Sequence, residues 1–176
     1  MIRKILNSYA EKMNQFVARS LPQQEGCAEV GFLGNGMESR PNKIRLFLYS
    51  TERESVPGNG IPIRKGGTPV ASGSQDLIMN LNVVVAAVFE ESRYAESLSF
   101  FSEALRFIQS CPAFLVDDVR YTVEIVSLGL QEMNNVWSCM GSQTFPSVMC
   151  KIRRLLINSG TVSKVAPSSN GYQIQD

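Results

Sequence analysis

The chain has 176 residues, of which 17 are Lys or Arg, 16 are Asp or Glu and none is His. This length suffices for one domain with its own hydrophobic core, so neither disulfide bonds nor a metal ion is needed to hold it together. The formal net charge of +1 gives no attraction toward nucleic acid or an anionic membrane, and we therefore expect protein or a neutral ligand as the partner rather than nucleic acid.

The four cysteines do not have the spacing of a metal site. Cys27, Cys111, Cys139 and Cys150 contain no CxxC pair, and without histidine a zinc site would need all four thiolates to meet in space. We therefore expect reduced, mostly buried thiols in a reducing compartment, and no metal or other cofactor.

The N-terminal segment is predicted to form an amphipathic helix. Apolar residues recur every three or four positions from Ile2 to Val17, and Pro22 and Gly26 follow where the helix should end. Polar residues interrupt this stretch, which argues against a signal peptide. The longest apolar run is far shorter than the ~20 residues that cross a bilayer. The sequence thus predicts a soluble protein made in the cytoplasm, without membrane insertion.

Several segments have the composition of strands. Residues 42–50 alternate, with bulky groups on both faces, which predicts a strand that is covered on two sides. One face comprises Ile44, Leu46 and Leu48, and the other comprises Arg45, Phe47 and Tyr49. Residues 76–89 are rich in β-branched side chains and predict a central strand. Three further strands are predicted at residues 28–33, 119–128 and 147–157.

Two more helices are predicted between these strands. Residues 90–112 form the first, which Pro112 ends. Five side chains of this helix are expected to face the core, namely Tyr94, Leu98, Phe101, Leu105 and Ile108. Residues 130–141 form a short helix capped by Gly141. Trp137, the only tryptophan, is predicted to anchor this helix in the core with its indole N–H bonded to backbone, and a docking role at the surface is the alternative.

Two segments are predicted to lack regular structure. Residues 51–73 contain five glycines and three prolines, and a loop of this length is usually functional or disordered. The chain from about Gly160 is rich in Ser, Gly and Gln, which predicts a mobile tail. We therefore expect one domain over residues 1–159 and a flexible tail over residues 160–176.

The residues that catalysis commonly needs are missing. Without histidine, the Ser-His-Asp and Cys-His arrangements and the HExxH helix are excluded. The glycines of residues 31–36 match neither nucleotide-binding spacing and predict a plain turn. Only Asp117, Asp118 and Glu124 could line a polar catalytic pocket, and the two aspartates are better explained as turn residues. We therefore expect a protein that is not an enzyme.

Five elements in a fixed order carry a resemblance to a known family. They are residues 42–49 (NKIRLFLY), 77–87, 98–112, 136–141 (VWSCMG) and 146–152. Their order and apolar pattern resemble the tail-terminator, or cap, family of phage-tail-like contractile injection systems of the antifeeding-prophage and virulence-cassette type. The resemblance implies a tail-terminator-like α+β fold, in which a single mixed β-sheet is packed by the N-terminal helix and one or two further helices.

The resemblance also implies a structural function. The chain would form a ring of six copies at the distal end of the inner tube and contractile sheath, ending their polymerisation and fixing the sheath to the tube. Its partners would be further copies of itself, sheath subunits and inner-tube subunits, assembled in the cytoplasm into a particle that stays there or is released. The residues alone leave a small, non-enzymatic protein-binding adaptor as the alternative.

Charged residues in the long loop and in the last strand are suited to such contacts, because charges can register neighbouring subunits around a ring. The predicted partner-binding residues are Glu52, Arg53, Glu54, Arg64, Lys65, Arg153 and Arg154. The alternative for the loop is a solvated segment without a partner.

Overall fold

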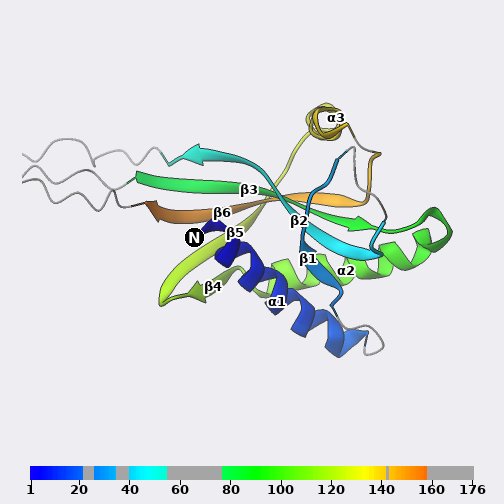
Figure 1. Ribbon diagram of the computed structural model, residues 1–176, viewed down its shortest axis with the longest axis horizontal. Helices are drawn as coiled ribbons and strands as arrows, with labels where there is room; N and C mark the ends of the chain where they lie inside the picture. Colours follow the sequence, from blue (N-terminus) through cyan, green and yellow to red (C-terminus); the bar gives the residue numbers. More distant parts are fainter. Residues whose placement is uncertain (22–25, 35–39, 55–76, 142, 158–176) are drawn as a thin grey trace, which may run out of the picture.

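The structure is a computed structural model that describes residues 1–21, 26–34, 40–54, 77–141 and 143–157. These residues form one sheet with the strand order β1-β2-β3-β6-β5-β4 and three α-helices (Figure 1). The helices are α1 (Ile2–Ser20), α2 (Tyr94–Ser110), which follows a 3-10 turn η1 (Glu91–Arg93), and α3 (Leu130–Met140). The strands are β1 (Ala28–Val30), β2 (Lys43–Arg53), β3 (Leu77–Val88), β4 (Ala113–Val116), β5 (Val119–Val126) and β6 (Ser147–Ile157).

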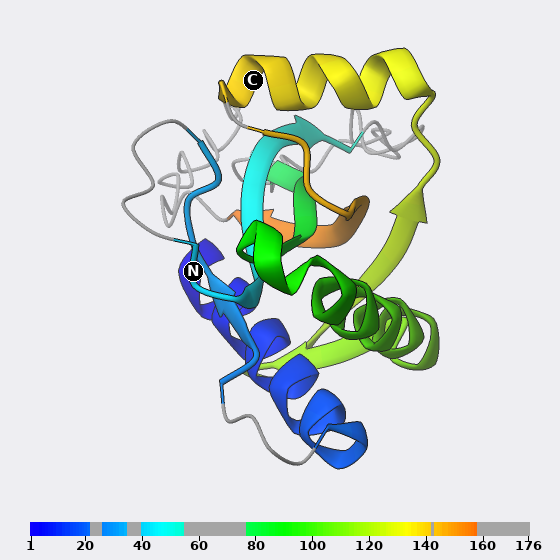
Figure 2. The same ribbon diagram turned by 90° about the vertical axis from the view of Figure 1, so that its right-hand side faces the viewer.

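The sheet is mixed, because β1 runs parallel to β2 and all other neighbouring strands are antiparallel. Helices α1 and α2 cover one face, and α3 lies over the other (Figures 1 and 2). The predicted α+β fold, a single mixed sheet packed by an N-terminal helix and one or two further helices, is therefore confirmed, and the further helices are two.

Strand β3 runs through the centre of the sheet, as its composition predicted. Its side chains alternate between two apolar clusters, one beneath α1 and α2 and the other beneath α3. The first cluster takes Val83, Val85 and Ala87, and the second takes Val84, Ala86 and Val88. A strand buried on both faces needs this nearly continuous apolar run.

Helix α1 buries the apolar stripe that its periodicity predicted. Its buried residues are Ile5, Leu6, Tyr9, Ala10, Met13 and Val17. The ring of Tyr9 lies 5.1 Å from that of Phe107 on α2 and 4.8 Å from that of Phe114 on β4, measured between centroids. Burial of each such aliphatic or aromatic side chain contributes roughly 1.5–3 kcal/mol, so this stripe fixes α1 to the sheet.

Helix α2 forms as predicted but turns a different stripe toward the core. Tyr94 is 57% exposed and Leu98 is 41% exposed, so the prediction that they face the core is wrong. Phe101 and Leu105 are half-buried, and Ile108 is buried. The residues that face the sheet are Ser97, Phe100, Ala104, Phe107 and Ile108. The helix carries apolar residues on two adjacent stripes, and periodicity alone does not decide which one is covered.

Strand β4 was not predicted, although the turn after it was. Asp117 and Asp118 have φ values of 50° and 61° and form a two-residue turn between β4 and β5. Asp tolerates positive φ better than most residues, which suits a hairpin turn. The two aspartates are therefore turn residues, as expected, but they follow a strand rather than a helix.

Other boundaries also differ from the predictions. Strand β1 ends at Val30 rather than at residue 33, and β2 continues to Arg53, so residues 51–53 belong to a strand instead of the long loop. Pairing of Glu52 with Asn80 and of Arg53 with Met79 extends β2. Residues 55–76 and 158–176 lie outside the described residues, so the rest of the loop and the tail over 160–176 stay predictions.

Candidate partner-binding surfaces

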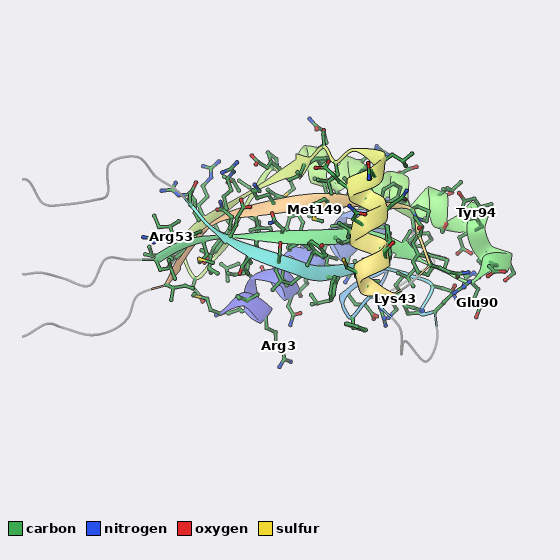
Figure 3. All side chains as sticks on the ribbon, turned by 90° about the horizontal axis from the view of Figure 1, so that it is seen from above. Arg3, Lys43, Arg53, Glu90, Tyr94 and Met149 are labelled. Carbon is green, nitrogen blue, oxygen red and sulfur yellow. The ribbon has the colours of Figure 1, made fainter. Side chains whose placement is uncertain are left out.

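Within the described residues, α3 covers only part of its face of the sheet. Figure 3 shows α3 lying across the strands near Met149, with Arg53 at the strand ends on one side and Lys43 on the other. Beneath α3 the face is apolar and includes Val84 and Met149. Beyond α3, toward the strand ends that carry Arg53, the same face continues with polar residues such as Ser50 and Asn82. The side-chain amide of Asn82 on β3 donates a hydrogen bond of 3.1 Å to the hydroxyl of Ser50 on β2.

Ion pairs join three strands on this uncovered part of the face. Lys151 Nζ lies 2.6 Å from a carboxylate oxygen of Glu52, which links β6 to β2. Arg153 lies between two carboxylates, 2.5 Å from that of Glu124 on β5 and 3.6 Å from that of Glu54. The hydrogen bond from Lys151 lowers the pKa of Glu52, and the hydrogen bond to Glu124 raises the pKa of Arg153.

The predicted partner-binding residues do not gather at one place on the surface. Glu52, Glu54 and Arg153 come together on the α3 face, where their charges are paired within the subunit. Arg53 lies opposite Met79, whose side chain packs against the cluster beneath α1, so it belongs to the other face. Arg64 and Lys65 lie outside the described residues. That any of these residues contacts a partner stays a prediction.

Arg154 occupies a β-bulge. Two β6 residues, Arg153 and Arg154, stand opposite the single residue Asn80 of β3, and Arg154 has a φ of 76°. The buried side chain of Asn80 accepts a hydrogen bond of 3.4 Å from the Arg154 backbone N–H. Bulges sharpen the local twist of a strand, and this one redirects the end of β6.

A groove of about 360 Å³ separates α3 from the polar end of the sheet. Its lining combines Tyr49, Ser50, Glu52, Asn82, Met149 and Lys151 from the strands with Val126, Leu128, Glu132, Asn135 and Val136 from β5, the following segment and α3. Glu132 is held in place, because its carboxylate accepts a hydrogen bond of 2.7 Å from the Gly129 backbone N–H. The groove offers amide, hydroxyl and charged groups beside an apolar floor.

Trp137 anchors α3 to the sheet. It is 2% exposed, and its ring meets that of Phe145 at 5.7 Å in an edge-on arrangement. The prediction of a core anchor is confirmed. The predicted bond to backbone is wrong, because the indole N–H donates to the hydroxyl of Ser147 on β6 at 3.3 Å.

A second groove, of about 700 Å³, lies between the N-terminal half of α1 and β4. Lys4 and Asp117 both line it and are paired, with Lys4 Nζ 2.6 Å and 2.7 Å from the two carboxylate oxygens. Because β4 was not predicted from the sequence, this groove was missed. The signal was present in FLVDDVRYTV, where two aspartates separate a short apolar run from an alternating one, as in a hairpin.

The weak catalytic candidates do not form a site. Asp117 is paired with Lys4, Asp118 completes the turn, and Glu124 is bound to Arg153 further along β5. Within the residues that the structure describes, no three His, Cys, Asp or Glu side chains lie close enough to hold a metal ion. No helix among those residues is long and apolar enough to cross a membrane.

The cysteines differ in their surroundings, and all four are free. Cys27 and Cys150 are buried, Cys111 is half-buried and Cys139 is exposed, so the prediction of burial is wrong for Cys139. Burial raises the pKa of the Cys150 thiol to about 12, which keeps it protonated and unreactive at neutral pH.

These observations define an α+β domain with one mixed sheet, surface grooves and charges that are paired between strands. The sequence matches the family described as the Pvc16 N-terminal domain over residues 1–170, and the chain belongs to this family. The resemblance to tail terminators is thereby confirmed. No curated protein matches the sequence.

A solved structure with a similar fold is a cryo-EM structure of an extracellular contractile injection system, described as the PVC sheath/tube terminator in the extended state. The TM-score is 0.51 at 13% sequence identity, and the match covers 94% of this chain and 64% of the other. The chain therefore spans slightly less than two thirds of the length of that terminator. At this identity the likeness shows a shared fold.

Proposed function

We propose that this chain is a structural terminator of a contractile injection system. Six copies form a ring at the distal end of the inner tube and sheath, where the ring ends polymerisation and fixes the sheath to the tube. The observation that carries the proposal is the fold shared with a sheath/tube terminator over 94% of this chain. Membership in the Pvc16 N-terminal domain family supports it.

The arrangement of surfaces is consistent with a ring subunit. A head-to-tail ring needs two different surfaces on each copy, one for each neighbour, and further contacts for the tube and the sheath. The groove beside α3 and the groove between α1 and β4 are two such surfaces. They differ in shape and lining, as the two sides of a head-to-tail contact do.

The proposed partners are further copies of the chain, sheath subunits and inner-tube subunits. The ring acts without a cofactor, without nucleic acid, without membrane insertion and without catalysis. It is assembled in the cytoplasm as part of a particle that stays there or is released.

Native mass spectrometry and co-expression test the proposal. The chain is expected to give a species of six-fold mass and to co-purify with sheath and tube subunits. In cells that lack it, sheaths are expected to lose their uniform length. A monomer or dimer that binds one component and leaves sheath length unchanged would favour the adaptor instead and would contradict the proposal.

The loop and its charges are tested separately. Because β2 continues to Arg53, replacing residues 55–76 with a short Gly and Ser linker spares the strand. We expect an unchanged melting temperature and loss of the six-fold species. Replacing only Arg64 and Lys65 with Ser is the matched variant, and it should weaken the ring without abolishing the fold. A ring that survives both changes would remove this segment from the interface.

A further inference from the structure

The outer edge of β2 is closed along only the first part of its length. Strand β1 pairs with β2 from Ile44 to Leu46. The outward groups of β1 are themselves closed by α1, because the side chain of Asn14 donates to the Ala28 carbonyl at 2.9 Å and accepts from the Ala28 N–H. Beyond Leu46, no strand among the described residues lies beside β2 on this side. Unpaired backbone groups along a sheet edge invite another strand.

The open part of the β2 edge presents the backbone groups of Thr51 and Arg53. The Glu54 N–H bonds to the Ile78 carbonyl at 2.9 Å, so Glu54 faces β3, and so does Glu52 two residues earlier. The alternation along a strand therefore turns the N–H and C=O groups of Thr51 and Arg53 outward. Within the part of the chain that the structure describes, no hydrogen bond reaches these four groups.

The edge at β4 is open in the same way. The Val123 N–H bonds to the Pro112 carbonyl at 2.8 Å, directly before the first residue of β4. This bond fixes the alternation, so Phe114 faces β5 and the groups of Ala113 and Leu115 face outward. Among the described residues, the one bond to these outward groups is a weak thiol contact of 3.6 Å at the Ala113 carbonyl.

The two open edges match in direction. Four successive antiparallel pairings lead from β2 to β4, so the two strands run the same way on opposite sides of the sheet (Figure 1). A neighbouring copy that keeps the orientation of the first therefore brings its β2 beside β4 as a parallel strand.

The two open edges also match in their faces. Phe114 packs into the cluster beneath α1 and α2, so the next residue, Leu115, lies on the α3 face. Glu52 lies on the α3 face as well, because it lines the groove beside α3. A parallel pairing with Leu115 opposite Glu52 therefore continues the sheet with α3 on the same side in both copies, as a head-to-tail ring needs.

We propose that β4 of one copy pairs in parallel with the open part of β2 of the neighbouring copy, with Leu115 opposite Glu52. In a parallel pair, a residue whose groups face the partner strand bonds to the residues before and after the one opposite it. Leu115 therefore donates to the Thr51 carbonyl and accepts from the Arg53 N–H of the neighbouring copy. The Ala113 carbonyl accepts from the Thr51 N–H, so three hydrogen bonds join the two strands.

The side chains at this contact complement each other. Leu115 is 59% exposed, and Tyr49, which precedes Glu52 on the α3 face, is 37% exposed, so the pairing brings two exposed apolar groups within reach of each other. Arg120, opposite Leu115 on β5, is exposed on the same face and adds a positive charge near the neighbour's Glu52.

The two grooves given above to neighbouring copies flank these edges, one along β4 and one along the end of β2. The pairing thus specifies the contact between copies, and it rests on the proposed ring.

A proline at position 115 tests the backbone pairing. The Leu115 N–H faces outward, so Leu115→Pro keeps the hydrogen bonds of the β4–β5 hairpin while it removes the donor and blocks the edge. We expect the circular-dichroism spectrum of the unsubstituted chain and, in native mass spectrometry, a loss of the six-fold species by about tenfold or more. The matched variant Leu115→Ser keeps the N–H and should keep the ring.

Arg53→Pro makes the same test from β2, with Arg53→Ala as its control, and serves where Leu115→Pro does not fold. A ring that survives the proline variants would overturn the pairing alone. An unsubstituted chain that forms no ring would contradict the proposed function, and the pairing with it.

Cross-linking identifies the two strands that meet. With Cys111 and Cys139 replaced by Ser, a chain that carries both Leu115→Cys and Glu52→Cys should give a covalent ladder of up to six copies with a short bifunctional thiol reagent. Either cysteine alone should give no ladder, and neither should Leu115→Cys combined with Ser99→Cys on the exposed side of α2.

A covalent dimer formed by Leu115→Cys alone would mean that two β4 edges pair with each other, and it would overturn the head-to-tail contact. A ring of six-fold mass without a ladder from the double variant would assign the β4 edge to another partner and would overturn the pairing as well.

Discussion

The two faces of the sheet are built from the same strands but are filled differently. The face beneath α1 and α2 is apolar over nearly its whole length, and two helices cover it. On the face beneath α3, an apolar cluster of seven buried residues lies between two groups of ion pairs. One group surrounds Glu29, which bonds to Lys43 and Arg45, and the other surrounds Arg153 at the opposite end.

The difference shows that the residues of a strand change from apolar to polar where the helix above the strand ends. Along the α3 face of β3, Val88, Ala86 and Val84 are followed by Asn82 and Asn80, and the change falls where α3 no longer lies above the sheet. An apolar continuation would have left an exposed patch. Among the described residues, no helix lies over this polar stretch, and its composition is that of a surface rather than of a core.

The largest expected effect follows from the single attachment of α3. Val136 and Trp137 are its two buried residues, so Trp137→Ala should cost about 3–5 kcal/mol and release α3 from the sheet. Amide exchange should become fast in α3 while β3 keeps its protection. The matched variant on the other face, Phe107→Ala, should lower protection in α1, α2 and β3 together. Equal loss in β3 for both variants would show that the two faces unfold as one unit.

The sequence correctly predicted the features that depend only on neighbouring residues within one helix or strand. The stripe of α1, the apolar run of β3 and the Gly141 cap of α3 each arise from the residues themselves, and Gly141 indeed has a positive φ of 62°. The buried stripe of α2 was mispredicted because Phe100 and Phe107 compete with Tyr94 and Leu98, and the choice depends on where the sheet lies.

The candidate binding surfaces depend on which strands pair and in which register, and this pairing could not be predicted from the sequence. Lys151 and Glu52 are brought together because β3 stands between their strands and sets their register. Asn14 closes the β1 edge from a helix that is 14 positions away in the chain. Charged residues could be identified as candidates from the sequence, but their pairing within the subunit could not.

A smaller effect is expected at Tyr9, on the face beneath α1 and α2. The residue is 1% exposed, and its hydroxyl has no hydrogen-bond partner among the described residues. Burial raises the pKa of the phenol, which stays neutral. Tyr9→Phe removes an unsatisfied polar group and should leave the free energy of unfolding unchanged or raise it by up to about 1 kcal/mol. Urea unfolding measures this, with Tyr94→Phe at the exposed position as the control.

A loss of more than about 1 kcal/mol in Tyr9→Phe would contradict this expectation. It would show that a buried water molecule completes the hydrogen bonding of the hydroxyl. The face beneath α1 and α2 would then contain a polar site within its apolar cluster, and the contrast between the two faces would be weaker than the packing indicates.

The smallest effect concerns the ion pairs at Glu29 on the α3 face. Burial alone would raise the pKa of Glu29, but hydrogen bonds from Arg45 and Lys43 outweigh it and lower the pKa. A carboxylate with a lowered pKa stabilises the fold fully above the ordinary glutamate value of about 4.3, and the contribution is lost as the pH falls through the lowered value. Glu29→Gln should therefore cost about 0.5–1 kcal/mol at pH 7, as partly exposed ion pairs do, and little at pH 3. Urea unfolding of both proteins across this range measures the difference, and repeating the substitution in an Arg45→Gln background should reduce it. A cost that is the same at pH 3 and pH 7 would mean that Glu29 acts through packing, and the ion pairs would then fill the α3 face without stabilising it.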